Sequence, residues 1–136
     1  MKYVLDTNAV SALMRGDARV VARLKRTARA DVYVPQPVFA EIAYGIARLA
    51  RSKRRAALEE RLEWIRAEIQ RAPWDDAVSD LFGTVKAALE RRGHPIEDFD
   101  VAIAAHALAA QAVLVTANVG HMARVPGLPI ENWSES

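Results

Sequence analysis

Short apolar runs rich in β-branched residues alternate with segments of helical spacing along this chain. Three clear runs and two weaker ones lie at Lys2–Leu5, Asp31–Val34, Val113–Thr116, Gln70–Ala72 and Leu128–Ile130. They have the length and composition of β-strands, and the three clear runs stop at residues that favour turns. Strands that alternate with helices pair in parallel and are covered on both faces. The order therefore predicts an α/β fold with a central parallel sheet of four to five short strands flanked by helices.

The segments between these runs have apolar residues at the spacing of helices. The predicted helices begin near Ala9, Asp17, Pro37, Ser52 and Asp75. Gly16 separates the first two, and Gly93 closes the helix that starts at Asp75 as a C-terminal cap. The segment Val101–Leu108 is apolar nearly all round, which predicts a buried helix in the middle of the fold.

Length and composition limit the class of protein. With 136 residues, of which 51% are apolar, the chain has the size of one domain with one core, spanning residues 1–136. Asp6 interrupts the first apolar stretch before a signal peptide could form, and no apolar stretch reaches the length of a membrane span. The absence of cysteine favours a reducing compartment. We therefore expect a soluble, cytoplasmic protein without membrane contact.

Acidic residues stand where a parallel sheet places functional groups. Asp6 directly follows the first strand, Glu41 lies in the helix after the second, and Asp98 and Asp100 open the buried helix before the fourth. Ligand sites in such sheets lie beyond the carboxyl ends of the strands. Clustered carboxylates repel one another, and a hard divalent cation such as Mg²⁺ or Mn²⁺ relieves that repulsion. Without cysteine, the ligands on offer are oxygens or imidazoles.

Each of these residues also has a purely structural interpretation. Asp6 and Asp98 suit the N-cap of a helix, and for Asp98 we favour the cap over direct contact with a metal. Asp100 lies in a first helical turn, where the helix dipole favours a negative charge. A lone glutamate such as Glu41 is more often solvated than functional. His106, among alanines, suits a hydrogen-bonded core residue better than a ligand.

Four motifs together match a known pattern. They are Leu5-Asp6-Thr7-Asn8, Phe39–Gly45, Phe99–Ala107 and Val115-Thr116-Ala117-Asn118. In this order they resemble the PIN-domain family, and most closely the VapC-type toxins of bacterial toxin-antitoxin pairs. The tail Gly127–Trp133 also resembles the end of such toxins, so the resemblance covers essentially the whole chain.

The resemblance implies an Mg²⁺-dependent endoribonuclease, with Mn²⁺ as a substitute. By position, Asp6, Glu41 and Asp100 would be the catalytic acids, with Asp6 and Asp100 as the metal ligands. The supporting residues would be Asn8, which orients a carboxylate, Asp98 as an extra acid, and Thr116 and Asn118, which line the site. Many relatives carry a further acid where this chain has Asn118 and His121, which leaves open whether one or two ions bind.

The basic residues suit an RNA substrate. They gather in residues 15–29 and 48–55, whereas residues 97–100 hold three acids and no base. Basic helices beside an acidic cleft suit a polyanion, although solvated arginine-rich helix faces are also common. The resemblance further implies a cognate antitoxin bound in a groove of the early helices, whose arginine could pair with the acids, and a homodimer.

Two other functions remain as alternatives. The first is a non-catalytic PIN-like module that binds RNA or protein, which His121 makes plausible. The second is an Mg²⁺-dependent phosphatase or receiver-like domain. That class needs a lysine in the loops at the sheet end, and the only lysine after Lys53 is Lys86, inside a predicted helix.

Overall fold

The central element of the structure is a sheet of short parallel strands. The computed structural model describes residues 1–135, and within them five strands pair side by side, all in parallel. They are β1 (Tyr3–Leu5), β2 (Val32–Pro35), β3 (Gln70–Ala72), β4 (Val113–Val115) and β5 (Ile130–Glu131). Their order is β3-β2-β1-β4-β5. The predicted parallel sheet of four to five short strands is confirmed.

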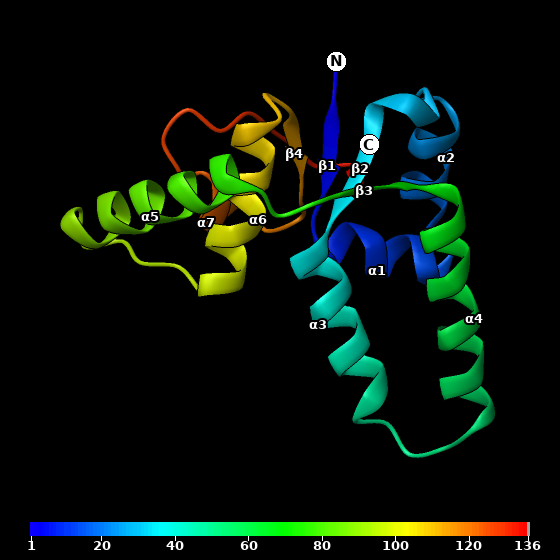
Figure 1. The fold of residues 1–136 in the computed structure, drawn as a ribbon. Helices are drawn as coiled ribbons and strands as arrows, with labels where there is room; N and C mark the ends of the chain where they lie inside the picture. Colours follow the sequence, from blue (N-terminus) through cyan, green and yellow to red (C-terminus); the bar gives the residue numbers. More distant parts are fainter. Residues whose placement is uncertain (136) are drawn as a thin grey trace.

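Helices connect consecutive strands and cover the sheet (Figure 1). They are α1 (Thr7–Arg15), α2 (Ala18–Lys25), α3 (Gln36–Ala47), α4 (Lys53–Glu68), α5 (Asp76–Arg91), α6 (Asp98–Ala109) and α7 (Val119–Met122). Helices α5 and α6 lie on one side of the sheet, and α1, α2 and α4 lie on the other. The sequence did not predict α7 or the 3-10 turn at Arg29–Asp31, because segments this short show no periodicity.

The predicted helix ends coincide with local capping interactions. Gly16 has a φ of 75° and Gly93 a φ of 71°, the left-handed conformation that glycine adopts without strain after a helix. At the other ends, the side chains of Asp17, Ser52 and Asp75 accept hydrogen bonds from backbone N–H groups in the first turns of α2, α4 and α5. Helix length is therefore set locally, by residues that can be recognised in the sequence.

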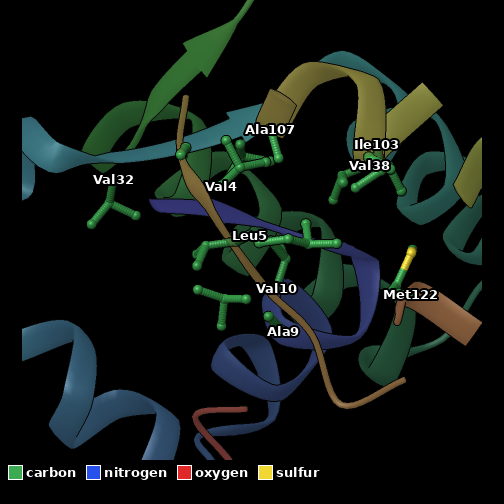
Figure 2. Close-up of a cluster of buried hydrophobic side chains, with 14 of the residues drawn as sticks. Val4, Leu5, Ala9, Val10, Val32, Val38, Ile103, Ala107 and Met122 are labelled. Carbon is green, nitrogen blue, oxygen red and sulfur yellow. The ribbon is translucent and has the colours of Figure 1, made fainter. Parts of the chain in front are cut away.

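The core forms on both faces of β1. Figure 2 shows Val4 directed toward Ala107 of α6 and Leu5 directed toward Val10 of α1, as the two-residue period of a strand requires. Helix α6 packs between the sheet and α5, which explains why Val101–Ala107 are all buried. No helix within residues 1–135 combines the length and the apolar character of a membrane span.

His106 is a polar residue inside this core. Only 2% of it is exposed, and its Nδ1 lies 2.8 Å from the carbonyl oxygen of Ala102. Since a carbonyl only accepts, Nδ1 carries the proton and donates, and Nε2 has no partner among the described residues. The ring meets Trp74 edge-on, with 5.5 Å between centroids. The expectation of a hydrogen-bonded core residue is confirmed.

Burial lowers the pKa of His106, against the opposite effects of its bond to Ala102 and of the nearby Asp75 carboxylate. The folded protein therefore holds His106 neutral, whereas the unfolded chain binds a proton below a pH of about 6.5.

We predict that His106 contributes a decrease in the free energy of unfolding as the pH falls from 7 to 5, because its protonation favours the unfolded chain. In His106→Leu this pH dependence is smaller, by up to about 1.4 kcal/mol per pH unit. Urea unfolding at several pH values measures it. His94→Gln, which changes an exposed histidine, should keep the wild-type slope. Equal slopes for the wild type and His106→Leu would contradict the prediction.

Candidate active site

Two residues that are far apart in the sequence meet where β1 and β4 end. Leu5 pairs with Val115, and the N–H of Asp6 donates to the carbonyl of Val115 at 3.0 Å. The next residues, Asp6 and Thr116, therefore lie side by side at the carboxyl edge of the sheet. After β1 and β4 the chain turns to opposite sides of the sheet. Open parallel sheets bind ligands at the edge between two such strands.

Asp6 is a buried carboxylate, only 3% exposed. Its Oδ1 accepts the N–H of Ala9 at 2.8 Å, so Asp6 caps α1 and the structural interpretation of this residue is confirmed. Burial raises the pKa of Asp6, and the negative charges of Asp100 and Glu41 raise it further, while hydrogen bonds from Thr116 and Ala9 lower it. The fold thus places a carboxyl group where its ionisation is unfavourable.

Glu41 lies partly buried in the second turn of α3 and is held by Thr7. The hydroxyl of Thr7 donates to Oε1 of Glu41 at 2.6 Å, joining the first turn of α1 to α3. Glu41 is thus not a simply solvated glutamate. Thr7 is not among the predicted site residues, although it stands in the motif Leu5-Asp6-Thr7-Asn8, directly after Asp6 at the end of a strand.

Asp100 is half-buried in the first turn of α6. Burial raises its pKa, and so do the charges of Glu41 and Glu97, whereas His121 lowers it. His121 is itself held by Asn118, with 3.1 Å between Nδ1 of the ring and Nδ2 of the amide. Asp6, Glu41 and Asp100, from three separate helices, therefore lie close enough to affect one another's ionisation.

The expectation that Asp98 caps α6 is wrong. The cap position is Glu97, which makes no side-chain capping bond, and the Asp98 side chain is 66% exposed. Its Oδ1 instead lies 3.0 Å from Nζ of Lys86 on α5. The close packing of α5 on α6 brings this lysine to Asp98, a neighbour that the local sequence does not reveal.

The polar residues beside the acids have different roles. Thr116 is buried, and its hydroxyl accepts the N–H of Asn118 at 2.9 Å, which fixes the turn after β4. Asn8 is exposed, and within residues 1–135 its side chain forms no hydrogen bond with a carboxylate. In this arrangement Thr7, rather than Asn8, orients an acid.

The carboxylate oxygens of Asp6, Glu41 and Asp100 are the type of ligand that hard cations such as Mg²⁺ prefer. Within residues 1–135, no three histidine or carboxylate side chains converge closely enough to hold a metal ion together. Glu41 is directed to Thr7 and Asp6 to Ala9, so a bound ion requires the carboxylates to approach more closely. The raised pKa values of Asp6 and Asp100 show why a cation would be favourable, since it relieves both burial and repulsion.

Some of the basic side chains in residues 15–29 and 48–55 form salt bridges within the fold. Arg23 pairs with Glu131 at 2.8 Å and Arg29 with Glu68 at 3.3 Å. Arg55 pairs with Glu59 at 3.4 Å. The remaining basic side chains of residues 15–29 and 48–55 are exposed, including Arg15 at the end of α1 and Arg51 between α3 and α4.

The chain is similar over its full length to a group of known proteins. Residues 3–128 match the family model of the PIN domain. The chain is 29% identical to Ribonuclease VapC2 of Rickettsia felis, with 99% of this chain and 100% of that protein covered. It is 28% identical to the tRNA(fMet)-specific endonuclease VapC of Shigella flexneri, with 98% and 99% covered.

A solved structure gives the same result. The crystal structure of VapBC2 from Rickettsia felis, bound to a DNA fragment from their promoter, contains a chain that superposes with a TM-score of 0.88 at 26% identity. The match covers 98% of this chain and 99% of that one. The arrangement of sheet and helices described above is therefore shared with this relative as a whole.

Two substitutions of Asp6 separate its cap from its charge. Asn also caps helices, whereas Ala does not, and both remove the buried negative charge. We expect Asp6→Asn to be more stable to unfolding than Asp6→Ala by about 0.5–2 kcal/mol, and at least as stable as the wild type at neutral pH without added metal. Chemical denaturation in the presence of a chelator measures this. Equal stability of the two variants would contradict the cap.

Proposed function

Because this chain belongs to the PIN-domain family, we propose that it is a VapC-type toxin: a metal-dependent endoribonuclease that hydrolyses RNA phosphodiester bonds and is neutralised by an antitoxin. The observation that carries this proposal is the gathering of Asp6, Glu41 and Asp100 at the carboxyl edge of the sheet. The ribonuclease names of relatives matched from end to end also support it.

The proposed cofactor is Mg²⁺, with Mn²⁺ as a substitute, held by Asp6 and Asp100. When bound at such acids, the ion lowers the pKa of a water molecule and stabilises negative charge on the leaving oxygen. Thr116 and the N–H of Ala9 fix the Asp6 carboxylate, and Thr7 fixes Glu41. Glu41 contributes the third negative charge. Asn118 holds His121 beside Asp100.

The proposed substrate is RNA held by its backbone. Exposed basic residues, among them Arg15 at the end of α1 and Arg51 between α3 and α4, suit the phosphate groups of an RNA backbone. Since these contacts are electrostatic, they hold the chain without selecting a sequence. One relative carries a tRNA-specific name, and a structured RNA of that class is the first substrate to test.

The proposed partner is an antitoxin bound between α3 and α4. A cavity of about 280 Å³ opens there, with Ala43 and Ala47 of α3 opposite Leu62 of α4. Arg55, Glu59, Glu63 and Arg66 give it a charged rim. Small apolar residues with a charged border suit a peptide segment. The structural relative, solved as VapBC2, supports such a partner. The homodimer remains part of this proposal on the family resemblance alone.

We predict that the purified protein cleaves RNA when Mg²⁺ or Mn²⁺ is present and stops when the ion is chelated. Asp6→Asn and Asp100→Asn should each reduce cleavage by at least roughly 100-fold, because both acids hold the ion. Cleavage of labelled RNA, followed over time on a gel, measures this. Asp80→Asn, an exposed acid on α5 outside the site, is the matched control and should retain full activity.

The controls separate this function from the alternative. Asp98→Asn should also retain activity, since Asp98 is exposed and paired with Lys86. Mg²⁺ should raise the melting temperature of the wild type but not of Asp6→Asn, since a ligand stabilises the state that binds it. Full activity in Asp6→Asn would contradict the catalytic site. RNA binding without any cleavage would support the non-catalytic module instead.

The antitoxin interface has its own test. We predict that Ala47→Arg weakens the complex with the protein encoded by the neighbouring reading frame by roughly tenfold or more, because the larger charged side chain fills the cavity. Co-purification and calorimetric titration measure binding. RNA cleavage by Ala47→Arg should equal that of the wild type, and unchanged binding would place the interface elsewhere.

A further inference from the structure

A second cavity adjoins the acidic site on the side opposite α3. Its volume is about 200 Å³. Asn8 and Ala9 at the start of α1 line it together with Thr116, and the segment Asn132–Ser134 closes the far side. Since Thr116 hydrogen-bonds to Asp6, the cavity and the acids share a wall. The cavity therefore lies next to the residue that holds the Asp6 carboxylate.

The inner walls of this cavity are small and apolar. Ala9, Ala12, Val20 and Val115 contribute them, and each of the four is buried. Trp133, also buried, closes one end. Pockets for drug-sized ligands measure about 300–1,000 Å³, so this cavity has room only for a smaller group, of the size of one heterocyclic ring system.

The rim offers hydrogen-bonding groups in fixed orientations. Oδ1 of Asn132 accepts the N–H of Ser134 at 3.0 Å and its hydroxyl at 2.6 Å, so the amide Nδ2 remains a donor for a ligand. Oδ1 of Asp17 accepts the N–H groups of Arg19 and Val20, each at 3.1 Å. Within residues 1–135 neither Nδ2 of Asn132 nor Oδ2 of Asp17 forms a hydrogen bond, so the rim offers one donor and one acceptor.

A small cavity with apolar inner walls and with a donor and an acceptor at its rim is complementary to a nucleobase, which has apolar faces and a hydrogen-bonding edge. We propose that this cavity binds one base of the RNA next to the phosphate that is cleaved, and that Asn132 and Asp17 select which base enters. The inference rests on the proposed ribonuclease function and adds a source of sequence preference to it. Arg15, exposed on the lining, suits the phosphate of the same nucleotide.

The cleavage test uses short single-stranded RNA of random sequence, with the products sequenced. We expect the wild type to prefer one base at a single position next to the cut by roughly tenfold or more, the size of one good base contact. Ala12→Leu, which fills the cavity, and Asn132→Leu, which removes the donor, should each reduce this preference to below about threefold. Ala67→Leu, on the exposed side of α4, should keep it.

A reduced base preference in Ala12→Leu or Asn132→Leu cannot come from partial unfolding. The preference is the ratio of the cleavage rates at two bases by the same protein, and unfolding lowers both rates equally. A wild type without a preference beside the cut, or variants that keep the full preference, would overturn the inference while the ribonuclease function stands.

A binding test covers the case in which no cleavage occurs. The four nucleoside 5′-monophosphates are titrated into the protein, and the amide signals of Val20 and Ser134 are followed by nuclear magnetic resonance. At least one nucleotide should shift these signals in the wild type but not in Ala12→Leu, and ribose 5-phosphate should not shift them. Shifts without RNA cleavage would keep the pocket and remove the catalytic proposal. No shift with any nucleotide would overturn the pocket.

Discussion

The fold keeps the carboxyl group of Asp6 buried at the end of its central strand. Asp6 is fixed by its own backbone bond to β4, by the first turn of α1 and by Thr116. Each contact comes from an element that also builds the core, so the position of the charge follows from the packing of the sheet. Two further acids, each from another helix, add to an unfavourable accumulation of carboxyl groups. Capping of α1 requires only Asp6, so it does not explain why Glu41 and Asp100 lie nearby.

Much of this arrangement could be predicted from local signals in the sequence. Gly16 and Gly93 mark the ends of α1 and α5, and the continuous apolar segment before β4 marks the buried helix. Asp6 could be placed because the residue after a parallel strand lies at the functional edge of its sheet. Such predictions work because helix caps and strand periodicity depend on residues only a few positions apart.

The errors and omissions at the candidate site depend on contacts between distant segments. Asp98 pairs with Lys86 because two helices pack closely, and Thr7 reaches Glu41 because α1 and α3 lie side by side. The cavity between α1, α2 and the C-terminal segment exists only because β5 brings Asn132 and Trp133 back beside the first helix. These contacts leave no periodicity or motif in the sequence, and two of them orient the side chains of Asp98 and Glu41.

The strand order has a consequence for how the protein is made. Tyr3 and Leu5 of β1 pair with Val113 and Val115, so the central pair of the sheet joins residues more than a hundred positions apart. Contacts of this kind form late, since the intervening chain must first be ordered or held close. During synthesis, Asp6 leaves the ribosome long before Thr116. The acidic edge is therefore assembled only after β4 has emerged, and a chain released earlier lacks the residues that would complete the site.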